Sequence, residues 1–419
     1  MVLAGGGTGG HVYPALAIAS AIRALRPAAD ILYIGGDRME ATIVPQAGLP
    51  FRSIAVHGIA GDIPAARRLR ALIEIAAWVP LFQSLSILRG FRPEVVIGTG
   101  GYVSGPVLLA AKLMRIPRLA LDGNRTPGWT SRLVARFVNV MAVAHPEMAE
   151  FFAARVGKGA RVEVTGLPIR ADVVSATRVR GARALGLDPA RFALVVFGGS
   201  LGSRRLNEAL RGALRRLVET SAAPSGSVGE PLCGLPPGLQ VLHVVGQRFA
   251  GENEPTSSPP SPSPRAERGQ LGSGMESGHT RGEVPGIAYK AVPYLGDHYG
   301  DALAAADLVV ARAGASTVAE LTARGLPSVL IPWSAASTGE QWLNAEPLGR
   351  AGAAVVIPDQ ELTADRLAAT LIELLGHPAR LARMAEASRG LGRPEAAKTV
   401  ATLALGLAEK RRGAASSRD

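Results

Sequence analysis

The chain alternates between short apolar runs and longer segments whose apolar residues recur at helical spacing. Runs typical of buried parallel strands occur in the first part of the chain at 2–4, 31–34, 95–97 and 119–121. Between the first two, Ile18, Ile22 and Leu25 recur at the spacing of one helical face. Strands and helices that alternate in this way predict a parallel sheet covered by helices on both faces.

The same pattern restarts in the second half of the chain. Further strand-like runs occur at 192–197, 241–245, 308–310 and 328–331. The first of them is followed by a second glycine-rich loop, from Gly198 to Gly202, and by a helix that begins near Arg204. The predicted fold class is therefore α/β, with two doubly wound, Rossmann-like domains. We expect their glycine loops to face each other across a cleft between the domains.

The junction between the two predicted domains lies near 166–176, so the domains are 1–166 and 167–385. The second contains a segment, 252–283, that is rich in Pro, Ser, Gly and charged residues. Almost nothing in this segment can be buried, so we predict a disordered surface insertion. The basic tail at 411–419 is expected to be flexible.

The composition is that of a folded globular protein. Of the 419 residues, 47% are hydrophobic and 19% are charged, which excludes a chain that is disordered throughout. The single cysteine, Cys233, cannot form an intramolecular disulfide, so we expect a reducing compartment. Lys and Arg total 46 against 34 Asp and Glu, and the net charge of +12 favours anionic partners.

The first glycine loop carries the motif G-x-G-x-x-G at Gly5, Gly7 and Gly10. Glycines let the backbone approach a phosphate closely, and the following helix offers free N–H groups. The motif alone is weak evidence for a dinucleotide, which also requires an acidic residue about 20 positions further on. Asp37 comes too late for that role.

His11 directly follows the first loop, where it could donate a hydrogen bond, cap the helix or act in the chemistry. The second glycine loop at Gly198 occupies the matching place in the second half. Two such loops suit a transferase that holds two substrates better than a dehydrogenase that holds one cofactor.

Two further segments offer binding groups at the carboxyl ends of predicted strands. The run 312–320 predicts a strand-to-helix turn with small residues, an anion cradle, with Glu320 one turn inside the helix. Gln341 and Asn344 follow the next strand, where amides suit sugar hydroxyls. The seven histidines are scattered without ligand spacing, so we predict no metal site and no cofactor.

Several motifs in order resemble those of the bacterial MurG family. The run from Gly6 to Leu16, GGTGGHVYPAL, is similar to the amino-terminal signature of that family. The run from Gly100 to Pro106, GGYVSGP, resembles a second family motif. The segments 37–40, 198–202, 314–320 and 341–345 fit as well, and the resemblance covers nearly the whole chain except 252–283.

The resemblance implies a GT-B fold, with a last helix at 386–410 that returns to the first domain. It implies inverting, metal-independent transfer of N-acetylglucosamine from UDP-N-acetylglucosamine to the muramoyl sugar of lipid I, which gives lipid II. It also implies a peripheral enzyme at the cytoplasmic face of the bacterial plasma membrane. Other cell-wall enzymes are expected as partners, and nucleic acid is not.

The resemblance also assigns roles to residues. Glu320 would bind the uridine ribose, Ser200 the diphosphate and Gln341 the donor sugar. His11 and Tyr102 would line the acceptor side. The remaining donor-binding residues implied by motif match are Thr8, Gly9, Gly10, Asn124, Arg170, Gly314, Ala315, Ser316 and Thr317.

The chain departs from the family pattern at several polar positions. Leu121, Asp122 and Gly123 stand where the family often has His-Glu-Gln, and Leu167 stands where an Asn is usual. Leu201 and Glu340 each replace a usual glutamine. The acceptor hydroxyl must lose a proton as it attacks the anomeric carbon. We predict that His11 is the base, with Asp122 as the rival.

A membrane-bound acceptor requires a surface that meets the bilayer. The segment 71–88 is long enough to span a membrane but is interrupted by polar residues and a proline, so we expect it to lie at the surface. Basic residues precede exposed apolar ones, as expected of an interfacial patch. The predicted patch is Arg67, Arg68, Arg70, Ile73, Trp78, Leu81 and Phe82. The alternative is that the apolar members are core residues of an ordinary helix.

Three other functions compete with this interpretation. A different GT-B enzyme could use another nucleotide sugar or lipid acceptor. An NAD-dependent oxidoreductase would use the first glycine loop but leaves the second unexplained. A nucleic-acid-binding protein would use the basic charge, although the arginines are spread through predicted helices and do not form one stripe.

Overall fold

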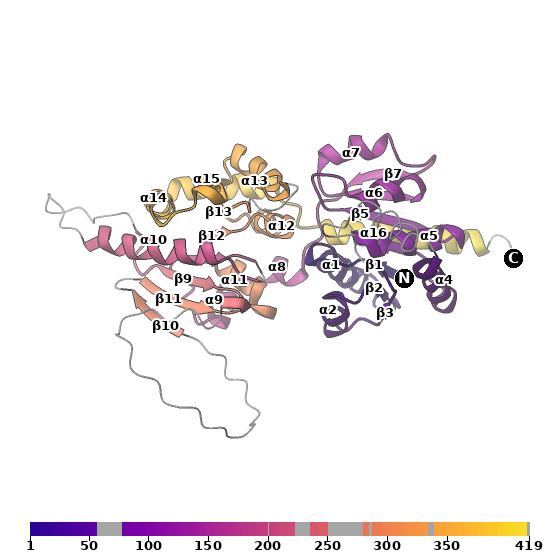
Figure 1. Cartoon of the computed structure of the whole chain (residues 1–419), viewed down its shortest axis with the longest axis horizontal. Coiled ribbons are helices and arrows are strands. Elements are labelled where there is room, and N and C mark those ends of the chain that lie inside the picture. Colours follow the sequence, from indigo (N-terminus) through magenta and orange to yellow (C-terminus); the bar gives the residue numbers. More distant parts are fainter. Residues whose placement is uncertain are drawn as a thin grey trace, which may run out of the picture. The chain divides into compact units, whose positions relative to one another are not determined.

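The computed structural model describes residues 1–56, 78–199, 201–222, 235–249, 280–284, 287–333 and 339–416. The chain divides into two compact units (Figure 1). Unit 1 comprises Met1–Val174, Gly314–Ala323 and Gly392–Asp419, and unit 2 comprises Ser175–Ala313 and Arg324–Leu391. The 314–323 segment therefore groups with unit 1, whereas the sequence placed it in the second domain. Its Ala315 and Ala319 pack against an apolar core of unit 1.

Unit 1 contains a seven-stranded parallel sheet in the order β3-β2-β1-β4-β5-β6-β7. Its strands are β1 Val2–Ala4, β2 Leu32–Gly35, β3 Phe51–Ser53, β4 Val96–Gly98, β5 Arg118–Asp122, β6 Val140–Val143 and β7 Arg161–Val164. Its helices are α1 Gly9–Leu25, α2 Glu40–Gln46, α4 Trp78–Phe91, α5 Gly101–Leu113, α6 Trp129–Val134, α7 Pro146–Ala153 and α16 Ala396–Ser416, and α8 Ala171–Ser175 lies at the unit boundary.

Alternate residues of the first strand point into two separate cores, as expected for a sheet covered on both faces. Leu3 packs with apolar residues of α1 and α16, whereas Val2 and Ala4 pack with those of α4, α5, α6 and α7. The last helix, α16, lies beside α1 and contributes Val400 and Ala404 to the core. The last helix was predicted at 386–410, but the structure has a break within that range, between α15, Pro378–Leu391, and α16, which groups with unit 1.

Unit 2 contains a second seven-stranded sheet in the order β10-β11-β9-β8-β12-β13-β14. Its strands are β8 Ala193–Phe197, β9 Gln240–Val244, β10 Thr280–Val284, β11 Ile287–Val292, β12 Leu308–Ala311, β13 Ser328–Leu330 and β14 Ala354–Val356. Its helices are α9 Arg178–Ala184, α10 Arg204–Ala222, α11 Tyr299–Ala305, α13 Glu340–Arg350, α14 Ala364–Leu375 and α15 Pro378–Leu391, while α12 Ala315–Arg324 follows β12.

The predicted α/β fold class with two doubly wound sheets is confirmed, and two local predictions are corrected. The tail at 411–419 was predicted to be flexible, but α16 continues through it to Ser416. Residues 280–283 were included in the disordered insertion, but they belong to β10, which pairs antiparallel with β11. An edge strand needs only backbone hydrogen bonds on one side, so its polar sequence gave no signal. Residues 252–279 lie outside the described residues.

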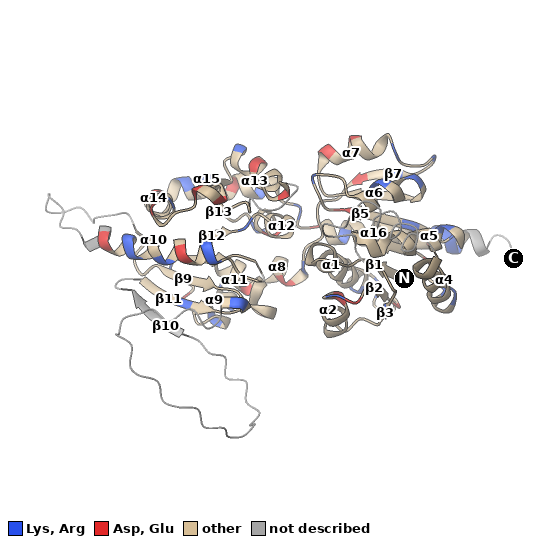
Figure 2. Cartoon of the chain, viewed as in Figure 1, with Lys and Arg blue, Asp and Glu red and all other residues tan. Residues whose placement is uncertain are grey.

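Each sheet has one point where the strand order reverses, between β1 and β4 in unit 1 and between β8 and β12 in unit 2. Ligands of open parallel sheets bind at the carboxyl ends of the strands at such a point. Both glycine loops of the sequence lie there, one after β1 and the other after β8. In the described part of the chain, Lys and Arg are scattered over the helices of both units and do not form one stripe (Figure 2).

A buried histidine in unit 2 links stability to pH. His243 is fully buried on β9, where its ring nitrogens contact the Tyr289 hydroxyl at 2.7 Å and Asn207 Oδ1 at 3.0 Å. Burial, with a smaller contribution from the charge of Arg211, lowers the pKa of His243 from 6.5 to about 3. The folded chain thus holds this imidazole neutral where the unfolded chain would protonate it.

We therefore expect the free energy of unfolding to fall as the pH is lowered below 6.5, because the unfolded state then binds the extra proton. For His243 alone the slope is up to about 1.4 kcal/mol per pH unit between pH 6.5 and 3. Urea denaturation of the wild type and of His243→Gln at a series of pH values measures the pH dependence of the free energy of unfolding. Equal slopes in the two proteins would contradict this expectation.

Candidate active site

The first glycine loop joins β1 to α1 and places His11 in the first turn of that helix. Gly7 has φ +93°, a backbone conformation that favours glycine. Thr8 is the extended residue before the helix, and its Oγ1 lies 3.2 Å from His11 Nδ1. The same Nδ1 lies 3.1 Å from the Gly6 carbonyl oxygen. Because a carbonyl oxygen only accepts, Nδ1 carries the hydrogen, and the neutral ring has its lone pair on Nε2.

The loop between β4 and α5 lies directly against the first loop, and its two glycines allow this contact. A Cβ atom on Gly100 would come within 2.6 Å of His11 Cδ2, and one on Gly101 within 2.2 Å of the Gly6 carbonyl oxygen. Both glycines have positive φ, +105° and +73°. Thr99 Oγ1 donates a hydrogen bond of 2.9 Å to the His11 carbonyl oxygen. The imidazole is therefore held between two rigid loops.

The loop after β5 is organised by Asp122, the predicted rival base. Its side chain is buried, and its two oxygens accept hydrogen bonds from the backbone N–H groups of Asn124 at 2.9 Å and Gly128 at 3.1 Å. The carboxylate thereby fixes the loop that presents Asn124. This role as a loop cap favours His11 as the base.

Two of the departures from the family pattern contact each other. A Cβ atom on Gly123 would come within 2.6 Å of Leu167 Cδ1, so the leucine side chain fills the space beside the glycine. Leu167 is buried in the same apolar core as Leu121. The replaced amides are thus compensated by an apolar contact behind the loop.

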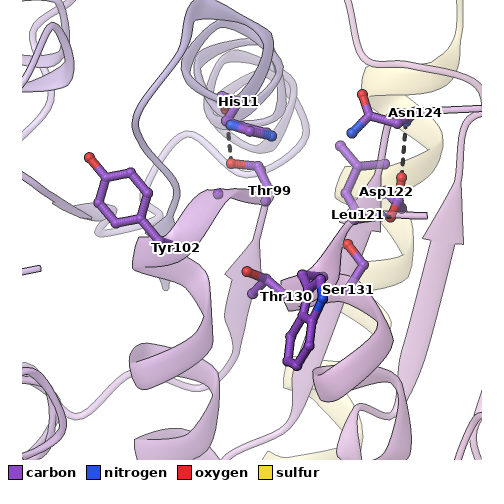
Figure 3. A pocket seen from close by; sticks show the side chains of 13 residues that line it. His11, Thr99, Tyr102, Leu121, Asp122, Asn124, Thr130 and Ser131 are labelled. Carbon is purple, nitrogen blue, oxygen red and sulfur yellow. Dashed lines mark hydrogen bonds between the residues drawn. The ribbon is translucent and has the colours of Figure 1, made fainter. Parts of the chain in front are cut away.

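These loops line a pocket with a volume of about 160 Å³ (Figure 3). His11 and Asn124 project toward it from opposite walls, and the start of α6 contributes Trp129, Thr130 and Ser131. Trp129 is 83% exposed. Thr99, Trp129, Thr130 and Ser131 were not predicted from the sequence, because only the strand order brings their loops beside the glycine loop.

Tyr102 also lines the pocket, but its ring extends away from His11 (Figure 3). A Cβ atom on Gly7 would come within 2.8 Å of this ring, and Arg38 lies over it at 5.8 Å. Burial raises the pKa of the Tyr102 phenol, against the opposing charge of Arg38. Its hydroxyl is buried and has no hydrogen-bond partner within the described part of the chain. This protonated hydroxyl could form a hydrogen bond with a polar atom of a ligand.

The other predicted donor residues of unit 1 lie at several places. Thr8, Gly9 and Gly10 form the start of α1, and the Arg170 guanidinium lies 5.5 Å from the ring centre of Tyr13 on that helix. Gly314, Ala315, Ser316 and Thr317 form the turn into α12 and its first residues, and Glu320 on that helix is buried. The role of this helix in donor binding stays a prediction.

In unit 2, a mostly buried arginine lies just behind the second glycine loop. Arg312 Nη2 donates to Ser203 Oγ at 2.7 Å, just after the loop, and Nη1 donates to Asp359 Oδ1 at 2.5 Å. Nη1 also donates to the Ile331 carbonyl oxygen at 3.3 Å. Three loops at the carboxyl edge of the sheet are thus joined by one guanidinium. Ser200 itself lies outside the described residues.

Gln341, the predicted donor-sugar ligand, is the second residue of α13. Its Oε1 accepts a hydrogen bond of 3.0 Å from the backbone N–H of Trp333. Asn344 on the same helix is buried and donates to the Ala313 carbonyl oxygen at 3.1 Å. Asn344 therefore has a structural role, while the Gln341 amide N–H group is the part that could meet a sugar hydroxyl. Over the described residues, no group of His, Cys, Asp or Glu is arranged to hold a metal ion.

Part of the predicted membrane patch is described. Trp78 and Phe82, on the first turns of α4, are 66% and 58% exposed, and their rings stack at 5.9 Å. Leu81, in contrast, packs partly against the core of unit 1. Arg67, Arg68, Arg70 and Ile73 lie outside the described residues. Within the described residues, no helix is both long and apolar enough to cross a bilayer.

Comparisons with known proteins agree with this fold. The family model described as Glycosyltransferase family 28 N-terminal domain matches residues 1–143, and the corresponding C-terminal domain model matches residues 193–400. MurG from Acinetobacter baumannii has a solved structure that aligns with a TM-score of 0.65 at 23% identity, covering 97% of this chain and 99% of that one. The fold and the site thus define a glycosyltransferase of family 28.

Curated relatives specify the family further. A protein of Desulforudis audaxviator is 39% identical over 411 residues, which are 98% of this chain and 99% of that protein. Another, from Moorella thermoacetica, is 37% identical over 406 residues, 97% of this chain and 98% of that protein. Both are named UDP-N-acetylglucosamine–N-acetylmuramyl-(pentapeptide) pyrophosphoryl-undecaprenol N-acetylglucosamine transferase. The chain belongs to this family, the MurG family, and the resemblance found in the sequence is confirmed.

Proposed function

We propose that this chain transfers N-acetylglucosamine from UDP-N-acetylglucosamine to undecaprenyl-diphospho-N-acetylmuramoyl-pentapeptide, lipid I, and so forms lipid II for peptidoglycan. The names of relatives at 37–39% identity over nearly the full length support this donor and this acceptor. The observation in the structure that carries the proposal is His11. Its ring lies between two loops at the reversal point of the sheet and lines a polar pocket, and its Nδ1 donates to the Gly6 carbonyl oxygen.

The reaction follows from this geometry. The acceptor hydroxyl attacks the anomeric carbon of the donor sugar, its proton passes to His11 Nε2, and the bond from that carbon to the UDP oxygen breaks. Attack opposite the leaving group inverts the anomeric configuration. The Gly6 carbonyl, which accepts from Nδ1–H, stabilises the imidazolium that forms.

We propose donor-binding residues in each of the two units. The second glycine loop with Ser200, shaped through Ser203 and Arg312, suits the diphosphate, and Gln341 suits the donor sugar. Glu320 would accept hydrogen bonds from the ribose hydroxyls, with Gly314–Thr317 at the start of the same helix. Thr8, Gly9, Gly10, Asn124 and Arg170 complete the proposed set.

Calorimetric titration tests donor recognition directly. We expect UDP-N-acetylglucosamine to bind with measurable heat, and more tightly than UDP-glucose or a reduced nicotinamide dinucleotide. Preference for the dinucleotide would favour the oxidoreductase alternative. Preference for another nucleotide sugar would assign the chain to a different transfer reaction. No heat with any uridine diphosphate sugar would contradict the proposal.

Trp129 is suited to hold an acceptor sugar at the mouth of the pocket. An exposed indole offers a flat apolar face against which the C–H groups of a pyranose can pack. We expect Trp129→Ala to raise KM for a soluble lipid I analogue about tenfold, and Trp129→Phe to restore most of the loss. Leu133→Ala, an exposed change on the same helix, is the control. Equal KM values for Trp129→Ala and wild type would contradict this role.

We further propose that the chain acts as a peripheral protein at the cytoplasmic face of an anionic plasma membrane, where lipid I is anchored. The stacked, exposed rings of Trp78 and Phe82 support this, because such rings favour the interfacial region of a bilayer. Basic residues at 67–70 precede them in the sequence and would meet acidic headgroups.

The double variant Trp78→Ser/Phe82→Ser should bind anionic vesicles at least about tenfold more weakly, since each ring loses its apolar contact with the lipid. Charge reversal of Arg67, Arg68 and Arg70 should also weaken binding, most strongly at low salt. Co-sedimentation with vesicles measures both, with Tyr294→Ser, an exposed ring of unit 2, as the control. Unchanged binding of both variants would remove this patch from the account.

A further inference from the structure

A fully buried carboxylate lies behind the first glycine loop. Glu40 is the first residue of α2 and is 0% exposed. Its Oε1 accepts from the Gly36 N–H at 3.0 Å, and the Gly7 N–H lies 3.3 Å from Oε1 and 3.2 Å from Oε2. The side chain therefore joins the loop after β2 to the loop after β1.

The surrounding glycines leave room for this carboxylate and for little else. A Cβ atom on Gly6 would come within 2.3 Å of Glu40 Oε1, and one on Gly36 within 2.9 Å of the same oxygen. On Gly35, a Cβ atom would come within 2.9 Å of Glu40 Cγ. The position of Glu40 is thus set by close backbone packing on three sides.

The Gly6–Gly7 peptide connects Glu40 to His11. Its N–H group, on Gly7, faces the Glu40 carboxylate, and its carbonyl, on Gly6, accepts from His11 Nδ1 at 3.1 Å. The described backbone contains no cis peptide bond, and in a trans peptide the N–H and C=O groups point in opposite directions. A carboxylate that holds one end of this unit therefore fixes the direction of the other.

We propose that Glu40 is a positioning residue that fixes the tautomer of His11 through the Gly6–Gly7 peptide. The negative carboxylate also polarises that peptide, which strengthens the carbonyl as an acceptor when the imidazole becomes charged. The expected effect on turnover rests on the proposed function, because it requires His11 to be the base. The expected effect on the His11 tautomer does not depend on the proposed function.

The test is nitrogen NMR of ¹⁵N-histidine-labelled protein, with the His11 signals assigned from the spectrum of His11→Ala. At a pH where imidazole is neutral, we expect the wild type to carry hydrogen on Nδ1. In Glu40→Gln we expect a substantial Nε2–H population, because a carboxamide presents an N–H group where two backbone donors need acceptors. Glu40→Asp, which keeps the charge, should lie between the two.

Steady-state kinetics provide the second measurement. Glu40→Gln should lower kcat about 10- to 100-fold and leave the affinity for UDP-N-acetylglucosamine within about twofold, as for a group that acts only on the base. Glu150→Gln, an exposed carboxylate on α7, should change neither kcat nor tautomer. If Glu40→Gln does not fold, the proposal is tested by the wild-type and Glu40→Asp spectra, in which Glu40→Asp should show a larger Nε2–H population than the wild type.

An Nε2–H tautomer in the wild type would overturn the proposal. An unchanged tautomer in a folded Glu40→Gln would also overturn it and leave Glu40 as a tie between loops, even if kcat fell. A shifted tautomer with wild-type kcat would support the coupling and count instead against His11 as the base.

Discussion

His11→Ala is expected to lower turnover about 100- to 10,000-fold while the affinity for UDP-N-acetylglucosamine changes less than about threefold. The imidazole lies beside the pocket of unit 1, between the first glycine loop and the loop after β4. Its removal would deprive the acceptor hydroxyl of the proposed base but leave the proposed diphosphate loop of unit 2 intact. Steady-state kinetics with a lipid I analogue, together with donor calorimetry, measures both quantities.

His377→Ala is a suitable control, because this histidine is exposed and its ring contacts the Glu373 carbonyl oxygen near the end of α14. Turnover of His11→Ala close to that of the wild type would remove the imidazole from the mechanism. An equal loss of donor affinity and turnover would indicate a damaged loop and not a missing base.

Arg312→Met is expected to lower the free energy of unfolding by about 3 kcal/mol. The side chains of Arg312 and Asp359 are only 12% and 11% exposed, so the substitution leaves a buried carboxylate without its cation. It also removes the donor to Ser203 Oγ and to the Ile331 carbonyl oxygen. Urea denaturation at neutral pH measures the change, and donor affinity should fall as well because the loop after β8 loses its support.

The matched control is Arg350→Met, which breaks an exposed pair with Glu346 one turn away on α13. Such a pair contributes only about 0.3–0.5 kcal/mol. If Arg312→Met were no more destabilising than this control, the Arg312 network could not be a structural support of the second glycine loop.

Eight strands, β1, β2, β4, β5, β8, β9, β12 and β13, could be predicted from the sequence because burial makes them continuous apolar runs. The interior strands β6 and β11 were missed, although β6 is fully buried. The edge strands β3, β7 and β14 were also missed, since their residues are partly exposed. The same holds for β10, which pairs on one side only. Backbone pairing at an edge imposes little requirement on side chains.

Pocket-lining residues were named in advance where a motif marks them and were missed where only the strand order brings them together. His11, Asp122 and Asn124 were identified in advance, and the structure places them around one pocket. Asp122 could not be recognised as a loop cap, because its partners are backbone N–H groups. The roles proposed for Glu40 and Trp129 could not be predicted from the sequence, because the contacts of these residues depend on the strand order. The opposed arrangement of the two glycine loops stays a prediction.

The most direct test of the central claim is a transfer assay with purified protein, a lipid I analogue and a panel of UDP-sugars, which scores UDP release and the mass and anomeric configuration of the product. We predict acceptor-dependent release of UDP from UDP-N-acetylglucosamine and a product that carries one added β-linked N-acetylhexosamine. Transfer of a different sugar, retention of configuration, or UDP release that does not depend on the acceptor would contradict the account.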